Sequence, residues 1–207
     1  VISPMKIICI GRNYAEHAKE MSSPLPQSPV FFLKPDTCLL RNNQPFFYPN
    51  FSENIHYEIE IVIKINRLGR NIQEKFAHRY YDEIALGVDF TARDLQQQCK
   101  EKGLPWEIAK AFDGSAPISK FLSVNVFKDV KSINFWLEKN GDVVQRGNTS
   151  EMIFSFDAII AYVSQFVTLK IGDLIYTGTP AGVGSVAIGD RLKGYINDEL
   201  LLDFFVR

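Results

Sequence analysis

Three carboxylates are candidate ligands of a metal ion. Glu58 and Glu60 are separated by one residue within an apolar, β-branched segment, residues 56–65. Side chains alternate along a strand, so these two carboxylates share one face. Asp89 ends another apolar run, a position where side chains are often presented to a cleft. Together they would form an oxygen-only site suited to Mg²⁺, Mn²⁺ or Ca²⁺, although a solvated strand face and a helix-initiating Asp89 fit the same patterns.

A histidine and a glutamate three residues apart form a second candidate. His17 and Glu20 share one face of a predicted helix over residues 13–21. A carboxylate that orients an imidazole is the usual construction of a general base that activates water, but the same spacing fits an ordinary surface pair. Residues 22–29 hold three prolines and three serines, which exclude regular structure. We therefore expect residues 13–29 to form a helix and loop that act as a lid over a substrate.

Basic and polar residues after Asp89 could meet an anionic substrate. Arg93, Gln96 and Gln97 fall on one side of a predicted helix. Lys110 is flanked by alanine, phenylalanine and tryptophan, which is typical of a partly desolvated cation, although most lysines are solvated surface residues. This part of the chain therefore predicts a polar wall suited to a carboxylate ligand.

The glycine-rich segment 178–184 does not predict a nucleotide site. It lacks the Gly-x-x-x-x-Gly-Lys pattern of a P-loop. Gly182, Gly184 and Ala187 match a loose dinucleotide fingerprint, but a turn at residues 189–190 follows where a helix would have to begin. The backbone amides of this loop could still hold a small carboxylate.

The elements that must position these residues are mostly strands. Thr91 with Asp94 three residues later resembles a capping box, so one helix is predicted from Thr91 to Lys102, ending at Gly103. A second helix is predicted over residues 150–169 from apolar residues spaced by three and four. The predicted strands cover residues 6–10, 56–65 and 83–88, with shorter ones between 30 and 65, and turns lie at 172–173 and 189–190. A β-rich α+β domain follows.

Composition limits the possible partners. The chain has 207 residues, of which 46% are apolar, and we expect a single domain over residues 1–207. Its 23 basic and 24 acidic side chains give a net charge of −1, so a nucleic-acid partner is not expected. No apolar run or leader predicts a membrane span or secretion. Three cysteines favour free thiols; we expect a cytoplasmic protein, with mitochondria as the open alternative.

These motifs occur together, in the same order, in one known family. Over residues 6–184 the chain resembles the fumarylacetoacetate hydrolase family, in particular its short branch of acylpyruvases and oxaloacetate decarboxylases. Each motif is short, but the ordered set is highly specific. The matching segments are Gly11-Arg12-Asn13-Tyr14 with His17 and Glu20, Phe32-Leu33-Lys34-Pro35, His56-Tyr57-Glu58-Ile59-Glu60, Gly87-Val88-Asp89 with Thr91-Ala92-Arg93-Asp94, Trp106 with Lys110-Ala111-Phe112-Asp113, and Gly178-Thr179-Pro180 with Gly182-Val183-Gly184.

The resemblance implies a mixed β-roll or sandwich that holds a divalent ion on the three carboxylates, usually Mg²⁺ with Mn²⁺ or Ca²⁺ as substitutes. It implies that His17 and Glu20 activate water, that Lys110 takes part in catalysis, and that the substrates are small β-dicarbonyl carboxylates. Members of the family are commonly homodimers, so we expect one here. The residues implied near the substrate are Arg12, Arg93, Gln96 and Thr179.

We therefore expect a Mg²⁺-dependent hydrolase that cleaves the C–C bond of acylpyruvates to pyruvate and a carboxylic acid. Water activated by His17 would attack the distal ketone, and a pyruvate enolate would leave with Lys110 stabilising its charge. Oxaloacetate decarboxylation, keto-enol tautomerisation and 2-hydroxyhepta-2,4-diene-1,7-dioate isomerisation stay open, because the same site could support them. A non-catalytic module that binds a divalent metal and a carboxylate is the remaining alternative, but it would not require His17, Glu20 and Lys110.

Overall fold

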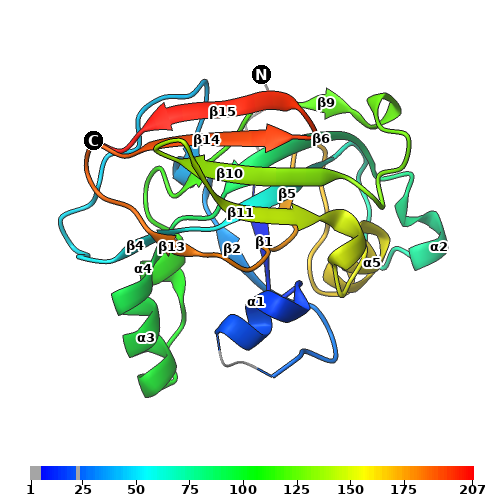
Figure 1. Ribbon diagram of the computed structural model, residues 1–207. Helices are drawn as coiled ribbons and strands as arrows, with labels where there is room; N and C mark the ends of the chain where they lie inside the picture. Colours follow the sequence, from blue (N-terminus) through cyan, green and yellow to red (C-terminus); the bar gives the residue numbers. More distant parts are fainter. Residues whose placement is uncertain (1–5, 22–23) are drawn as a thin grey trace.

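Two stacked β-sheets make up most of the computed structural model, which describes residues 6–21 and 24–207 (Figure 1). The larger sheet has the strand order β2, β1, β12, β5, β6, β9, in which only β1 and β12 are parallel neighbours. Its strands are β1 (Ile7–Gly11), β2 (Val30–Lys34), β5 (Ile59–Ile65), β6 (Tyr81–Val88), β9 (Leu122–Ser123) and β12 (Leu174–Tyr176). This arrangement confirms the predicted strand-rich α+β class.

The second sheet is antiparallel, in the order β11, β10, β14, β15. Two small sheets, β13-β4-β7 and β3-β8, complete the strands. The strands of these sheets are β3 (Leu39–Leu40), β4 (Ile55–Tyr57), β7 (Thr91–Ala92), β8 (Ala116–Pro117), β10 (Asn134–Lys139), β11 (Asp142–Asn148), β13 (Gly184–Ser185), β14 (Arg191–Ile196) and β15 (Glu199–Phe205).

Helices lie at the margins of the sheets. Those of the described residues are α1 (Ala15–Glu20), α2 (Glu74–Ala77), α3 (Arg93–Lys102), α4 (Glu107–Lys110) and α5 (Phe156–Phe166), with 3-10 turns at Asp36–Cys38, Val124–Val126 and Thr149–Glu151. α1 and α3 project from the same end of the molecule (Figure 1). None of the helices described is long and apolar enough to cross a bilayer.

The core lies between the two large sheets, and β5 is buried on both of its faces. Ile59, Ile61 and Ile63 belong to the larger apolar cluster, together with residues of the four-stranded sheet. Val62 belongs to a smaller cluster on the opposite side of β5. Because side chains alternate, Glu60 points to the same side as Val62, away from the larger core. The carboxylate is thus placed at the border of the smaller core cluster.

Two helix predictions require correction. The predicted capping box is wrong: Ala92 is the N-cap of α3 without a side-chain cap, because Thr91 is drawn into strand β7. The Asp94 carboxylate instead accepts hydrogen bonds from the Ser52 hydroxyl and the Glu53 backbone. The end of α3 was predicted correctly, since Gly103 follows it with a left-handed φ of 65°.

The helix predicted over residues 150–169 is shorter in the structure. α5 begins after Ser155, whose hydroxyl accepts a hydrogen bond from the Ala158 backbone, and ends at Phe166. Residues 149–151 form a separate 3-10 turn, because Asn148 and Glu151 cap it on their own. The predicted turns at residues 172–173 and 189–190 are present before β12 and β14.

The strand predicted over residues 56–65 is interrupted at Glu58. Ile55 pairs with Ala92 in the small sheet, and Ile59 pairs with Val88 in the large sheet. Both pairings have the same register, which places Glu58 opposite Asp89 in the gap between them. Two neighbouring segments, β4 to β5 and β6 to β7, therefore pass between the small and the large sheet at the same point of the register. Glu58 occupies that point on the first segment and Asp89 on the second.

Candidate metal and catalytic site

One cavity between α1, α3 and the end of the large sheet brings the predicted site residues together. Every one of them except Glu20 and Gln97 lines it. Glu20 contacts the His17 side chain, which does line the cavity, whereas Gln97 is exposed and donates to Glu101 on the same helix. The cavity is lined by Ile10, Gly11, Arg12, His17, Met21, Phe32, Glu58, Glu60, Asp89, Arg93, Gln96, Lys100, Trp106, Lys110 and Thr179. Sequence segments more than 150 residues apart thus converge, since Arg12 and Thr179 share this wall.

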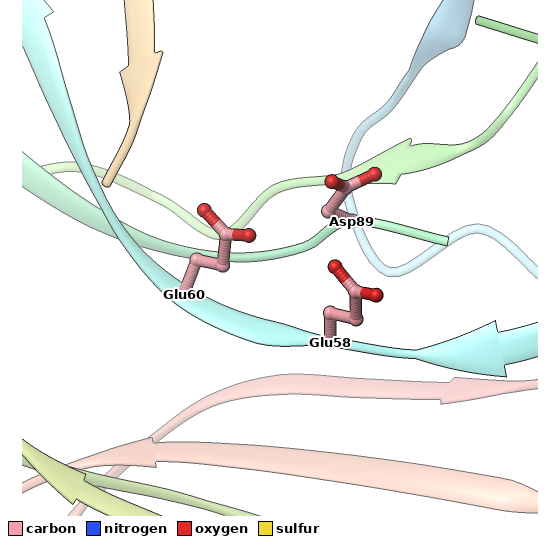
Figure 2. A group of neighbouring side chains, drawn as sticks. All are labelled: Glu58, Glu60 and Asp89. Carbon is pink, nitrogen blue, oxygen red and sulfur yellow. The ribbon is translucent and has the colours of Figure 1, made fainter. Parts of the chain in front are cut away.

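The three carboxylates meet in the cavity as predicted. Glu58, Glu60 and Asp89 are buried, and one oxygen of each lies within 4.8 Å of the others. Their side chains point toward one another from two neighbouring segments (Figure 2). The Asp89 backbone N–H donates to the Glu58 carbonyl at 2.8 Å, which fixes the two segments side by side.

Asp89 lies between two buried lysines. Lys34 Nζ is 2.7 Å from Asp89 Oδ1, and Lys110 Nζ is 2.8 Å from Oδ2. Lys110 Nζ also donates to Glu58 Oε2 at 2.9 Å. The ammonium of Lys110 therefore contacts two of the carboxylates that line the cavity. We had predicted that it would face an anionic substrate instead.

The two glutamates have different partners. Glu58 accepts hydrogen bonds from Lys110 and, at 2.6 Å, from Arg93 Nη2. Glu60 forms no ion pair with any residue that the structure describes; its Oε2 accepts the backbone N–H of Gly178 at 2.7 Å. Gly178 has φ 104°, and a Cβ there would lie 2.7 Å from the Asn13 Cβ, so a glycine is required to present this N–H.

These surroundings shift the pKa values of the site in opposite directions. Burial raises the pKa of Glu60 well above its usual value, and the charges of Asp89 and Glu58 add to the effect. Burial also acts on Glu58, but Lys110 and Arg93 hold the pKa of this carboxyl well below its usual range. Glu60 is thus the carboxylate whose negative charge is least compensated by the protein.

The His17 and Glu20 pair is formed as predicted. His17 is buried on α1, and its Nδ1 lies 3.1 Å from Glu20 Oε2. The Glu20 carboxylate also accepts the backbone N–H of Gly182, at 3.1 Å and 3.3 Å. Gly182 has φ 97°, and a Cβ would lie 2.4 Å from the Val144 carbonyl oxygen. The backbone amides of the glycine-rich loop thus do bind carboxylates, as predicted. The carboxylates that they bind in this structure are the side chains of Glu60 and Glu20.

Comparison with known proteins assigns the chain. Residues 6–200 match the family described as "Fumarylacetoacetate (FAA) hydrolase C-terminal". The chain belongs to the fumarylacetoacetate hydrolase family. The mitochondrial oxaloacetate tautomerase of Bos taurus is 44% identical over 200 residues, which cover 97% of this chain and 90% of that protein. A mitochondrial oxaloacetate decarboxylase of Dictyostelium discoideum is 43% identical over 189 residues, or 91% and 87% of the two chains.

Solved structures of the family agree with the fold. Fumarylpyruvate hydrolase from Pseudomonas aeruginosa, crystallised with Mn²⁺ and pyruvate, superimposes with a TM-score of 0.93 and 38% identity, over 98% of this chain and 89% of that chain. The fold and the enzymatic nature predicted from the sequence are thereby confirmed.

The acid triad fits the divalent metal of the fumarylacetoacetate hydrolase family. Its donors are all carboxylate oxygens, which hard divalent cations prefer over the nitrogen and sulfur ligands of Zn²⁺. Burial and the lack of a cationic partner in the described part of the chain disfavour the charged form of Glu60 and raise its pKa, and a bound cation would compensate that charge. The observed residues therefore support use of a divalent metal.

A residue that we did not predict holds this family site together. Gln145 on β11 is buried, and its Oε1 accepts the Ile59 backbone N–H at 2.9 Å. Its Nε2 donates at 2.9 Å to both Thr179 Oγ1 and the Pro180 carbonyl. The Thr179 hydroxyl in turn donates to the Ile59 carbonyl at 2.8 Å, so toward a ligand it can only accept. Gln145 thus ties the strand that carries Glu60 to the Thr179 loop.

Replacing Gln145 by leucine should destabilise the enzyme. The change leaves the Ile59 N–H and the Pro180 carbonyl without their side-chain partner, at about 1 to 3 kcal/mol for each buried group. Unfolding by urea, followed by circular dichroism, measures the loss. Gln165 on α5 bonds only weakly to the Ala161 carbonyl, at 3.4 Å, and its replacement by leucine should change the unfolding free energy by less than about 0.5 kcal/mol. Equal effects of the two changes would contradict the role given to Gln145.

Proposed function

We propose that this chain is a divalent-metal-dependent hydrolase that cleaves acylpyruvates with one water to pyruvate and a carboxylic acid. The observation that carries the proposal is the His17 and Glu20 pair beside the acid triad. His17 lines the same cavity as Glu58, Glu60 and Asp89 and is hydrogen-bonded to Glu20. A protein that only bound a metal and a carboxylate would not require a histidine oriented in this way.

The side chains divide the work between base and anion binding. With Nδ1 of His17 directed to Glu20, Nε2 is left to take a proton from water as that water attacks the distal ketone. The Oε1 of Gln96 accepts from Arg93 Nη1 at 2.7 Å, so the Gln96 amide N–H groups are left to donate to a substrate carboxylate. Lys110 holds Glu58 and Asp89 in place. A divalent ion held by Glu58, Glu60 and Asp89 would supply Lewis-acid stabilisation of the negative charge that develops in the reaction.

Oxaloacetate chemistry is the second candidate function. The relatives of 43% and 44% identity are named oxaloacetate decarboxylase and oxaloacetate tautomerase. Loss of CO₂ from oxaloacetate leaves the same pyruvate enolate as acylpyruvate cleavage, and tautomerisation needs proton transfer only. The same side chains would therefore serve these reactions, and the water-activating role of His17 is specific to the hydrolase.

An assay of the purified protein with Mg²⁺ or Mn²⁺ tests the proposal. The substrates are acetylpyruvate, fumarylpyruvate, oxaloacetate and the enol of oxaloacetate. We expect metal-dependent cleavage of acetylpyruvate, with stoichiometric pyruvate and acetate. Turnover of oxaloacetate or its enol alone would replace the hydrolase by the second candidate, and metal binding without any turnover would favour a binding module.

Several further properties stay proposals. We propose Mg²⁺ as the metal in the cell, a homodimer, and a single catalytic domain. The proposed lid of residues 13–29 begins at Asn13, whose amide makes three hydrogen bonds to the backbones of Phe154 and Thr177. Part of it, residues 22–23, lies outside the described residues. The mitochondrial names of the relatives favour the mitochondrial alternative over the cytoplasm for this chain.

A further inference from the structure

Two of the three carboxylates in the acid triad are already paired with cations of this chain. Asp89 contacts Lys34 and Lys110, and Glu58 contacts Lys110 and Arg93. With Glu60 ionised, three cations face three carboxylates, so this inner wall carries no net charge. A divalent cation on the triad would therefore give the inner cavity a surplus of two positive charges.

Two additional cations line the same cavity. Arg12 follows the end of β1, and Lys100 lies in the last turn of α3. Neither forms an ion pair with an acidic side chain in residues 6–21 or 24–207. Lys100 is exposed, and its Nζ lies 5.8 Å from the ring centroid of Trp106, which also lines the cavity. Because the acid triad is buried and Lys100 is exposed, Lys100 lies at the solvent side of the cavity.

Arg12 and Lys100 line one cavity, so their like charges act on each other. Lys100 is exposed but partly desolvated at the cavity, which lowers its pKa, and the positive charges of Arg93 and Arg12 lower it further. Arg12 has φ 60°, a conformation that residues other than glycine adopt at a cost. The fold thus places Arg12 in the same cavity as another cation, and no acidic side chain in the described part of the chain pairs with it. An anionic ligand between Arg12 and Lys100 would relieve this repulsion.

We propose that Lys100, together with Arg12, forms a subsite for a second carboxylate of the substrate. The cavity would then favour dicarboxylates, with a 2-oxo acid group at the acid triad and the other carboxylate at the cavity mouth. This inference rests on the proposed function, because it assumes that a 2-oxo acid binds beside the metal. It makes Lys100 a specificity-determining residue that selects substrates by charge.

Two ligands of equal chain length test the subsite. 2-Oxoglutarate and 2-oxopentanoate differ only in the terminal carboxylate, and their binding to the Mn²⁺-loaded protein is measured by calorimetry. The variant is Lys100→Met, and the control is Lys102→Met, which removes an exposed charge from the same helix outside the cavity. Lys100→Arg keeps the charge. The affinity for Mn²⁺ alone should be the same in all four proteins.

We expect the wild type to bind 2-oxoglutarate more tightly than 2-oxopentanoate. The difference in affinity should be smaller at high salt, because salt screens the exposed charges. Lys100→Met should weaken 2-oxoglutarate binding by about three- to tenfold, as for one partly exposed charge pair, and change 2-oxopentanoate binding by less than about twofold. Lys100→Arg should retain most of the preference, and Lys102→Met all of it. Equal losses for both ligands, an unchanged preference in Lys100→Met, or no preference in the wild type would overturn the subsite.

Acetylpyruvate separates this inference from the proposed function, since it has a single carboxylate. Wild-type protein that cleaves acetylpyruvate but shows no preference for 2-oxoglutarate keeps the proposed function and loses the subsite. Protein that cleaves no acylpyruvate, yet shows a preference that depends on Lys100, loses the proposed function and keeps the subsite.

Discussion

Replacing Glu60 by glutamine is expected to weaken binding of Mn²⁺ by more than about 100-fold, because one of three charged ligands is lost from a site for a hard cation. Cleavage activity should fall with it to background. The metal-free variant, by contrast, should be at least as stable as the wild type. Glutamine keeps an oxygen for the Gly178 N–H and removes a carboxylate that has no cationic partner among the described residues.

The pKa of Glu60 gives the sign of this stability change. It is raised in the folded protein, so ionised Glu60 subtracts stability as the pH rises from the unfolded pKa through the folded one. At neutral pH Glu60→Gln removes that loss. The wild type should regain stability with metal: at 100 times the dissociation constant, binding adds about 2.7 kcal/mol, or roughly 5 to 10 °C in melting temperature.

Thermal unfolding with and without Mn²⁺ reads both effects in one experiment. The matched control is Glu83→Gln, which removes a half-exposed carboxylate from the neighbouring strand β6, outside the cavity. That control should keep the full shift on addition of metal. A Glu60→Gln protein that gains as much melting temperature from Mn²⁺ as the wild type would show that Glu60 is not a ligand.

Replacing His17 by alanine is expected to reduce acetylpyruvate cleavage at saturating metal by about 100- to 10,000-fold, the usual contribution of a general base. Decarboxylation of oxaloacetate needs no attacking water and should fall by less than about tenfold, as a positioning effect rather than loss of a general base. Glu20→Gln should have a smaller effect than His17→Ala, since glutamine can still accept from His17 and from the Gly182 N–H.

The test compares the steady-state rates of acetylpyruvate cleavage and oxaloacetate decarboxylation in the variants and the wild type. The affinity for Mn²⁺ is measured as a check that the metal site is intact. Unchanged acetylpyruvate cleavage by His17→Ala would exclude water activation by this residue. An equal loss of cleavage and of enol-keto exchange would instead make His17 a proton carrier and would favour the tautomerase.

Residues that act with near neighbours in sequence could be predicted well. Strand periodicity predicted that Glu58 and Glu60 point to one site, and they do, although Glu58 lies in the break between β4 and β5. Helix periodicity likewise placed His17 and Glu20 on one face. The position of Asp89 at the end of an apolar run made it a candidate third ligand, but the family resemblance was needed to assign it to the same ion, because no local rule pairs it with Glu58. The structure supplies the physical reason, which is a common strand register across the gap.

Contacts over long sequence distances could not be predicted. Lys34 was part of a matching motif but received no role, since a buried lysine is recognised only by its partner, Asp89. Gln145 lies in a segment of mostly polar residues, and no pattern in the neighbouring sequence indicates that its side chain reaches the Ile59 backbone. The hairpin itself had a signal that our prediction did not use: Asn140 and Gly141, both with positive φ, join β10 to β11.

The interruption at Glu58 and Asp89 has a mechanical meaning. β4 and β7 belong to a small sheet, whereas β5 and β6 belong to the large one, and at this level the backbone N–H of Asp89 donates to the Glu58 carbonyl between the two strand pairs. A divalent ion held by Glu58 and Asp89 would add a second link between the two segments, beside this backbone hydrogen bond. Loading the metal would then brace the junction of the two sheets as well as activate the substrate, so chelation should loosen the small sheet first.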